Sequence, residues 1–438
     1  MTRVIISGGG TGGHIFPAIA IANALKANEK DIDILFIGAK GRMEMEKVPA
    51  AGYHIEGLNI SGFQRRLTWK NLSFPFKLAA SMMKARHIIS QFRPDLAIGV
   101  GGYASGPTLR ISTSKGIPSL IQEQNSYPGV TNRLLGSKVR KICVAYEGME
   151  KYFPHEKIIL TGNPIRQDII NIEDKKNEAR TFFGLDVNAK VILVLGGSLG
   201  ADTINHAIQK FVMETSGPRQ TGIQLLWQTG KHYFESICKQ MQDAGYRIQE
   251  FSFSEKQMVS PTPNASSVIC HPPSAIHDPA MPWLDLRSAS TSGIRHLVIL
   301  PFIDRMDLAY AAADLIISRA GAIAISELCV VGKPAILIPS PNVAEDHQTK
   351  NAMALVGQKA ALMIRDQEAV VKLGAMIGDV LGDQDLQTSL KNNMKPLAIS
   401  DAAEKIAVEA LKLIHPSASG LPASAIQGPA SLHHTQPA

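Results

Sequence analysis

The sequence predicts an α/β protein with two Rossmann-like, doubly wound domains that face a shared cleft. Two strand–glycine–helix units support this fold class. In the first, an apolar strand at residues 4–7 runs into glycines at 8–13 and then a helix pattern; in the second, a strand at 191–195 runs into glycines at 196–200. Glycines let a backbone approach a phosphate, and a helix N-terminus offers it free N–H groups. Such a pair of units is typical of enzymes that use a nucleotide sugar.

Length and composition agree with this fold. The 438 residues exceed what one core organises and fit two domains with additions. No run of 18 apolar residues occurs, and the chain opens on an apolar strand, so we expect neither a transmembrane helix nor a signal peptide. The four cysteines form no C-x-x-C pair, which argues against a zinc knuckle or a disulfide framework. We therefore expect a reduced, cytoplasmic protein.

The alternation of strand and helix patterns follows the chain in order. We expect strands at residues 3–7, 33–38, 95–100, 118–122, 140–145 and 157–161, and again at 190–195, 223–228, 296–301, 314–318 and 334–338. The turn at Asn163-Pro164 predicts a domain boundary, giving domains over 1–163 and 164–400. The proline-rich segment 260–292 is expected to be an irregular insertion, and the Ala/Ser/Pro-biased tail 416–438 to be disordered.

The net charge of +7 is concentrated in one stretch. Residues 57–94 contain no acidic residue and seven lysines and arginines, interleaved with aromatic and aliphatic side chains. One predicted helical face carries Leu72, Phe76, Ala79 and Met83. This basic amphipathic stretch, residues 61–93, favours docking to an anionic membrane, at about 1 kcal/mol per well-placed cation. The alternative is that the apolar face is ordinary core. No recognition motif accompanies it, so we expect no nucleic-acid partner.

Polar residues follow three predicted strands of the first domain. The first glycine loop lacks a G-x-G-x-x-G register, and no acidic residue ends the second strand, which disfavours a dinucleotide. His14 stands where this loop meets its helix, either as a group in the cleft or as a helix cap. Tyr103 lies in a third glycine cluster at 99–107, and Glu123 and Asn125 follow the strand at 118–122. Since ligands bind outside the carboxyl ends of parallel strands, we expect one polar cleft floor.

The second half offers charged candidates at equivalent positions. Arg319 follows the strand at 314–318 and is placed to meet a diphosphate. Glu327, in the next helix, is suited to bind two ribose hydroxyls, the alternative being a solvated helix face. His347 and Gln348 open a further helix. Asp31-Ile32-Asp33 has the form of a metal-binding DxD, but we interpret it as the start of a strand and expect no metal site.

These residues resemble a known family, the peptidoglycan glycosyltransferases that add N-acetylglucosamine to a lipid-linked muramoyl pentapeptide. The matching stretches, in the family's order, are GGGTGGHIFPAIAIA, GVGGYASGP, QEQNSYPGVTN, TGNPIR, GGSLGADTIN, PFIDRM, SRAGAIAISE and EDHQTKNA, and the match covers residues 2–414. The resemblance implies the glycosyltransferase B architecture, with a C-terminal helix at 401–415 returning to the first domain. The sequence departs from the family in its long 260–292 segment and in His347, where many relatives have glutamine.

The resemblance also implies residue roles. Ile303 would contact uracil, Glu327 the ribose, and Ser198 and Arg166 the phosphates of UDP-N-acetylglucosamine. The other implied donor contacts are Thr11, Gly12, Gly13, Asn125, Arg319, Ala322 and Gln348. His14 is the candidate base, with Glu123 as its rival and Tyr103 beside them in the catalytic set. No cofactor or metal is expected, because helix N-termini take the place of a cation at the diphosphate.

The implied reaction is an inverting transfer of N-acetylglucosamine to the C4 hydroxyl of the muramoyl sugar on undecaprenyl diphosphate. It would place the protein at the cytoplasmic face of the inner membrane as a peripheral protein, with other cell-wall synthesis proteins as partners. A UDP-N-acetylglucosamine 2-epimerase, which uses the same architecture and donor, is the main alternative, but it would not need the basic apolar stretch. A non-catalytic nucleotide-sugar-binding scaffold is a further one.

Overall fold

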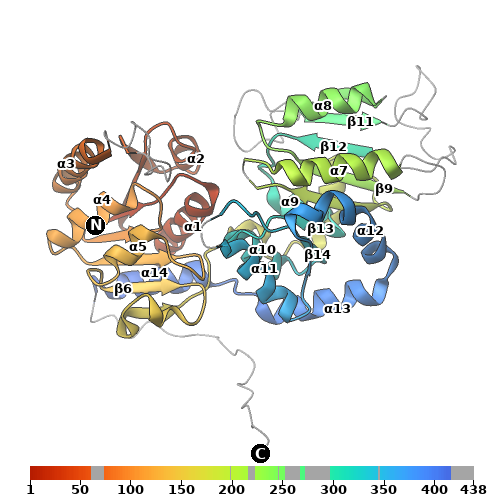
Figure 1. Ribbon diagram of the computed structural model, residues 1–438. Helices are drawn as coiled ribbons and strands as arrows, with labels where there is room; N and C mark the ends of the chain where they lie inside the picture. Colours follow the sequence, from red (N-terminus) through yellow and green to blue (C-terminus); the bar gives the residue numbers. More distant parts are fainter. Residues whose placement is uncertain are drawn as a thin grey trace, which may run out of the picture.

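The computed structural model describes residues 1–60, 74–197, 199–215, 222–244, 246–251, 267–271, 296–343 and 346–415. These residues form two α/β units, each with a twisted sheet and helices packed on its faces (Figure 1). The predicted fold class is therefore confirmed. Both sheets owe their burial to near-continuous apolar strands, which parallel sheets need because helices cover both of their faces.

The first sheet has seven parallel strands in the order β3-β2-β1-β4-β5-β6-β7. Their bounds are β1 (Thr2–Ser7), β2 (Ile32–Ala39), β3 (His54–Leu58), β4 (Leu96–Gly99), β5 (Ser119–Glu123), β6 (Lys141–Val144) and β7 (Ile158–Leu160). The strand order reverses between β1 and β4, so the loops that follow these two strands border the crevice where such sheets bind ligands. The sequence had not predicted β3, whose pattern His-Ile-Glu-Gly-Leu is too polar to read as a buried strand.

The helices of the first unit are α1 (Gly12–Asn28), α2 (Glu44–Ala50), α3 (Phe74–Phe92), α4 (Ser105–Ser114) and α5 (Val130–Leu135). A sixth helix, α14 (Ala402–Lys412), comes from the far end of the described chain and packs against α1 (Figure 1). Its apolar face, which includes Ile406 and Leu411, completes the core over β1 and β4.

The second sheet has eight strands in the order β10-β11-β12-β9-β8-β13-β14-β15. Their bounds are β8 (Lys190–Leu195), β9 (Ile223–Gln228), β10 (Arg247–Phe251), β11 (Ser267–His271), β12 (His296–Leu300), β13 (Leu315–Ser318), β14 (Ala335–Leu337) and β15 (Leu362–Met363). The order reverses between β8 and β13, which places the second glycine loop beside the residues after β13. The helices are α6 (Lys176–Phe182), α7 (Asp202–Thr215), α8 (Phe234–Asp243), α9 (Met306–Ala312), α10 (Ala322–Val331), α11 (His347–Gly357), α12 (Ala369–Gly382) and α13 (Gln384–Met394).

The expectation of an irregular segment over 260–292 is wrong for β11. This strand pairs antiparallel with both β10 and β12 and extends the sheet to its edge. The run Ser-Val-Ile-Cys-His has the β-branched residues of a strand, but the prolines before and after it concealed the signal. The rest of that segment, and the tail 416–438, lie outside the described residues.

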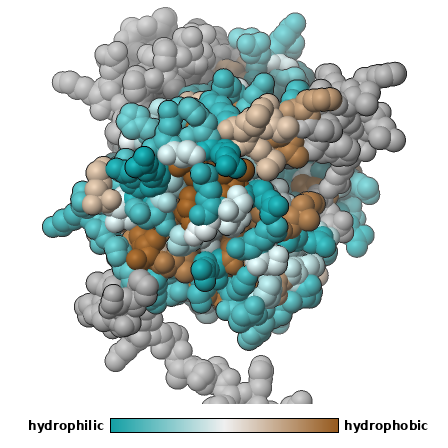
Figure 2. Space-filling view, turned by 90° about the vertical axis from the view of Figure 1, so that its left-hand side faces the viewer, coloured by the Kyte–Doolittle hydropathy of each residue, from teal (hydrophilic) through white to brown (hydrophobic). Residues whose placement is uncertain are grey.

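Helix α3 carries the described part of the basic amphipathic stretch. Its inner face packs Ala85, Ile88 and Ile89 into the core, whereas Phe76 is 79% exposed and Met83 is 69% exposed. The alternative that the Phe76–Met83 face is ordinary core is therefore wrong. Leu72 lies outside the described residues. Figure 2 shows this side of the first unit, where hydrophobic patches lie among hydrophilic side chains.

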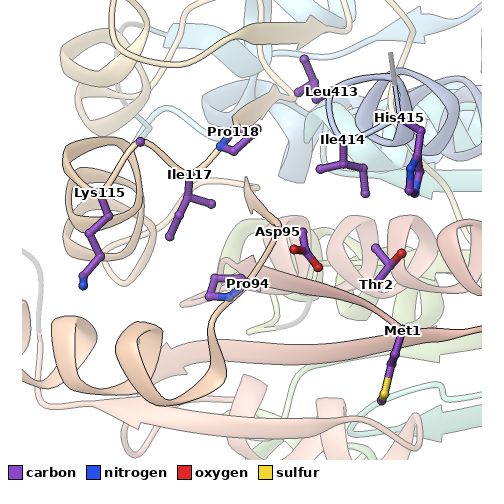
Figure 3. A pocket seen from close by; sticks show the side chains of 11 residues that line it. Met1, Thr2, Pro94, Asp95, Lys115, Ile117, Pro118, Leu413, Ile414 and His415 are labelled. Carbon is purple, nitrogen blue, oxygen red and sulfur yellow. The ribbon is translucent and has the colours of Figure 1, made fainter. Parts of the chain in front are cut away.

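No helix in the described part of the chain is long and apolar enough to cross a membrane. A pocket of about 610 Å³ opens at the amino ends of β1, β4 and β5, beside the end of α14 (Figure 3). Its one carboxylate, on Asp95, accepts a hydrogen bond from the Arg3 N–H at 2.8 Å. Because ligands of such sheets bind at the carboxyl ends of the strands, this pocket lies at the opposite edge from the candidate site.

Candidate active site

The floor of the site is built where two glycine loops touch. Gly101 and Gly102, after β4, have φ angles of +93° and +84°, a conformation that favours glycine. A Cβ atom on Gly102 would lie 2.2 Å from the carbonyl oxygen of Gly9, and one on Gly101 would lie 2.9 Å from Cε1 of His14. Gly101 and Gly102 therefore let the loop after β4 close onto the loop after β1 and onto the His14 ring.

His14 lies in the first turn of α1, with its ring enclosed by these loops. Burial lowers the pKa of its imidazole below the usual 6.5, and the negative charge of Glu123 only partly opposes this effect. The Nδ1 atom is buried and has no hydrogen-bond partner among the described residues. His14 is thus a neutral imidazole at neutral pH, the protonation state that a general base requires.

The sequence analysis missed a buried acid that is hydrogen-bonded to the first glycine loop. Glu44, the first residue of α2, is 1% exposed, and its carboxylate accepts hydrogen bonds from the N–H of Gly10 at 2.9 Å and of Ala39 at 3.0 Å. Part of the loop's anion-binding capacity is therefore filled by the protein itself. The start of α1 stays open, because Thr11 and Gly13 are exposed and the first N–H groups of a helix have no intrahelical acceptor.

Glu123, the predicted rival base, organises the loop that follows β5. One carboxylate oxygen accepts hydrogen bonds from the Asn125 N–H at 3.0 Å and side-chain Nδ2 at 3.3 Å. The other accepts from the Gly129 N–H at 3.0 Å and from Asn132 Nδ2 at 2.9 Å. Asn125 is held in place by this arrangement. Tyr103 stands apart at the rim of the site, where it is 49% exposed.

Two predicted donor-site residues, Arg166 and Glu327, meet at the boundary between the two units. Arg166 Nε donates to Glu327 at 3.1 Å, and the guanidinium lies 4.5 Å from the ring centroid of Phe16, which is on α1. The Tyr310 hydroxyl donates to the other Glu327 oxygen at 2.9 Å. Burial, reinforced by Glu327, raises the pKa of Tyr310, so the hydroxyl remains protonated and donates. Glu327 is 6% exposed, so the alternative of a solvated helix face is wrong.

The second glycine loop is held differently from the first. The side-chain amide of Gln228, at the end of β9, donates to the Gly197 carbonyl at 3.0 Å and accepts from the Ile303 N–H at 2.8 Å. Gln228 therefore links this loop to the predicted uracil contact, a role the sequence gave no signal for. The Ile303 side chain is buried in the core. Ser198 lies outside the described residues.

The remaining predicted donor residues are already hydrogen-bonded. Arg319 forms an ion pair with Asp366 and donates to the carbonyls of Ile338 and Pro339 at 3.0 and 3.2 Å. Gln348 accepts from the Ser340 N–H at 2.9 Å. The structure thus holds Arg319, through its Nη1 atom, in a network that joins β13 to the loops after β14 and β15. Ala322 is buried at the start of α10.

The DxD-like triplet has another role. Asp31 forms an ion pair with the N-terminal amine at 2.7 Å, and β2 begins at Ile32, as the sequence analysis interpreted it. Among the described residues, no group of three or more His, Cys, Asp or Glu side chains is arranged to hold a metal ion.

Two facing Rossmann-like units, with a partly buried histidine in one and an acid–arginine pair in the other, define an enzyme of the glycosyltransferase B architecture. The chain belongs to glycosyltransferase family 28. The family's N-terminal domain matches residues 4–144, and its C-terminal domain matches residues 191–272 and 284–407.

Named relatives support this assignment. The UDP-N-acetylglucosamine–N-acetylmuramyl-(pentapeptide) pyrophosphoryl-undecaprenol N-acetylglucosamine transferase of Flavobacterium psychrophilum is 47% identical over 94% of this chain and 98% of its own length. A crystal structure of MurG from Acinetobacter baumannii, at 24% identity, aligns over 94% of this chain and 100% of its own with a TM-score of 0.63. A UDP-GlcNAc 2-epimerase from Neisseria meningitidis, bound to UDP-GlcNAc, is 14% identical and aligns over 94% of this chain and 99% of its own with a TM-score of 0.59. At those identities the two structures support the fold alone.

Proposed function

We propose that this protein transfers N-acetylglucosamine from UDP-N-acetylglucosamine to the C4 hydroxyl of the muramyl sugar in an undecaprenyl-diphosphate-linked muramyl-pentapeptide. The relatives named for this reaction provide the substrate class. The observation that carries the mechanism is the contact between Phe16 and Arg166. Phe16 and His14 are both near the start of α1, so this contact brings the donor-side arginine against the helix that carries the candidate base.

In this mechanism His14 takes the proton of the attacking hydroxyl. The acceptor oxygen bonds to the anomeric carbon as the bond from that carbon to the diphosphate breaks, and UDP departs with the electron pair. A positioned base is worth about 10²- to 10⁴-fold in rate. Glu123 is less suited to this role, because each of its oxygens already accepts two hydrogen bonds. Tyr103, at the exposed rim, is placed to contact the acceptor.

The negative charge that develops on UDP is stabilised by fixed donors. Arg166 and the N–H groups of the second glycine loop, including that of Ser198, would face the diphosphate, as preorganised donors do for other developing anions. Ile303 and Glu327 would receive uracil and ribose. The start of α1 at Thr11, Gly12 and Gly13, together with Asn125 and Gln348, would meet sugar and phosphate atoms, and no metal is required.

Membrane binding through the 61–93 stretch completes the proposal. On α3, exposed Phe76 and Met83 lie beside exposed Lys77 and Arg86, so apolar and cationic groups share one surface. This surface supports a peripheral position on the inner face of the membrane, where the lipid-linked acceptor and other cell-wall synthesis proteins would be met. Phe76→Ser with Met83→Ser should weaken binding to anionic vesicles in a flotation assay; unchanged binding would contradict this part.

The reaction is tested by turnover with labelled UDP-N-acetylglucosamine and a short-chain lipid-linked muramyl-pentapeptide, without added metal. We expect sugar on the lipid and an equimolar amount of UDP. Release of UDP without the acceptor, or conversion of the donor to its 2-epimer, would instead support the epimerase alternative. The exposed α3 surface favours the transferase, because an epimerase has no lipid substrate to reach.

A further inference from the structure

A second pocket, of about 310 Å³, lies between the two units and has no role in the mechanism so far. Its first wall comes from the loop after β5 and the segment after β6. The second wall is α11, which belongs to the second unit (Figure 1). The residues that matter here are Ser126, Tyr127, Lys151, Tyr152, Lys350 and Asn351.

Aromatic rings and cations are interleaved around this pocket. Tyr127 and Tyr152 pack edge to face, with ring centroids 5.3 Å apart. The Arg133 guanidinium lies 5.7 and 5.8 Å from these two centroids, and Lys151 Nζ is 5.1 Å from that of Tyr152. Lys350 Nζ approaches Tyr127 from the other unit at 5.9 Å. Both units therefore contribute positive charge to one aromatic site.

These cations are not neutralised by the protein. Arg133, Lys151 and Lys350 are all exposed, and none forms a salt bridge within the described parts of the chain. Three like charges around one concave surface raise the local concentration of anions. The expected ligand therefore carries negative charge.

The pocket also has two unused hydrogen-bonding atoms. Ser126 Oγ and Asn351 Oδ1 are buried and have no partner among the described residues. Asn351 is fixed in orientation, because its Nδ2 donates to the Ala320 carbonyl at 3.2 Å. One hydroxyl that can donate and one amide oxygen that accepts match a ligand with both C=O and N–H groups. A peptide has both.

We propose that this pocket binds the peptide of the acceptor, with Lys151 and Lys350 on its carboxylate and the tyrosine rings against its backbone. The inference rests on the proposed function. A peptide joined through its amino end to the muramyl group keeps a free C-terminal carboxylate. The position of the pocket also fits the acceptor. Ser126 and Tyr127 directly follow Asn125 at the carboxyl end of β5. Strand β5 pairs with β4, and the loop after β4 contacts His14. A sugar placed at His14 can therefore extend its peptide into the pocket.

The test compares two lipid-linked acceptors, one with the pentapeptide and one without it, in the full-length enzyme. For the Lys151→Ala/Lys350→Ala double variant, we expect KM for the pentapeptide acceptor to rise about tenfold, and each single variant to give about three- to fivefold. KM for the peptide-free acceptor and for UDP-N-acetylglucosamine should stay within about twofold of the wild-type values. Higher salt should narrow the difference between wild type and variant, because exposed charges are screened.

Lys239→Ala is the matched control, since Lys239 is an exposed lysine on α8 of the second unit and forms no salt bridge within the described residues. Equal losses on both acceptors, a rise in the donor KM, or no change on the pentapeptide acceptor would each overturn the inference while leaving the proposed function intact. A wild-type enzyme that transfers sugar to neither acceptor would instead contradict the proposed function, and the inference with it.

Discussion

The two glycine loops of this protein have similar sequences and different surroundings. In the first, the Glu44 carboxylate accepts a hydrogen bond from the Gly10 N–H, and the loop after β4 packs against Gly9. In the second, a neutral amide, that of Gln228, and the Gly200 N–H both donate to the Gly197 carbonyl, and no carboxylate accepts from the described N–H groups of the loop. A carboxylate of the protein in the loop repels a bound anion, whereas a neutral amide that donates to a loop carbonyl does not. A strand–glycine–helix motif alone therefore does not identify the diphosphate site.

From this difference we infer a division of labour. The first loop is braced at Gly10 by Glu44 and at Gly9 by the loop after β4, and it holds His14, the candidate base. Only its end, at residues 11–13, would meet the donor. The second loop is open and, with Arg166, is suited to the donor diphosphate. The comparison predicts that changes around the first loop act on the rate of the chemical step, and changes around the second on donor binding.

The largest effect is expected at His14. His14→Ala should lower kcat by about 10²- to 10⁴-fold, because the rival Glu123 already accepts two hydrogen bonds on each oxygen, and the donor KM should change little. Steady-state kinetics with the lipid-linked acceptor measures both. His54→Ala, an exposed histidine on β3, is the control. A loss of only a few-fold would remove His14 from the role of base.

Glu44→Gln should have the next largest effect. The amide keeps the shape of the side chain but presents an NH₂ group to one of the two backbone N–H donors, so the first loop and the adjacent His14 ring are expected to shift. We predict a fall in kcat of about tenfold and a loss of about 1–3 kcal/mol in the free energy of unfolding. Kinetics and urea denaturation measure them. Glu46→Gln, an exposed acid on the same helix, should change neither, and an unaltered Glu44→Gln enzyme would break the comparison.

Tyr310→Phe probes the donor side. The substitution leaves one Glu327 oxygen without its buried donor, so the carboxylate is less well placed for the ribose. The donor KM should rise about fivefold, and kcat should stay within about twofold of the wild-type value. Tyr53→Phe is the control, because its hydroxyl bonds Asn23 in the first unit at 2.6 Å. A fall in kcat with an unchanged donor KM would contradict the division.

The pH dependence gives the smallest expected effect. Burial lowers the pKa of His14, so the imidazole takes up its proton at a lower pH than an exposed histidine does. Between its folded pKa and 6.5 the unfolded chain binds more protons, so stability from this group falls as pH falls through that window. We expect the acid-side decline of kcat/KM to begin at a lower pH than the titration of an exposed histidine would give. A decline that begins well above pH 7 would show a histidine in an exposed environment.

How much the sequence could predict follows from the range of the interactions. Strands β1 and β8 were predictable, because each is a short apolar run followed at once by glycines. Glu44 and Gln228 were not, because their partners lie 34 and 31 residues away and only the fold brings them together. Arg319 was predicted to meet a diphosphate from its place after a strand, whereas the structure pairs it with Asp366, 47 residues further on.

The family's motifs supplied what periodicity alone could not. Arg166 was singled out only by the resemblance, and the structure shows why local sequence gave no reason for it, since its partners Phe16 and Glu327 come from both units. Strand β11 was hidden by flanking prolines, although its residues favour a strand. Local composition predicts a strand poorly when the strands that pair with it are distant in the sequence.

The most direct test of the division between the two loops is calorimetric titration of UDP-N-acetylglucosamine into the wild-type enzyme, Glu44→Gln and Gln228→Ala. The account predicts that Gln228→Ala weakens donor binding about five- to tenfold, because the loop and Ile303 lose their shared support, while Glu44→Gln binds the donor as the wild type does. Weaker binding in Glu44→Gln with normal binding in Gln228→Ala would assign the diphosphate to the first loop and contradict the account.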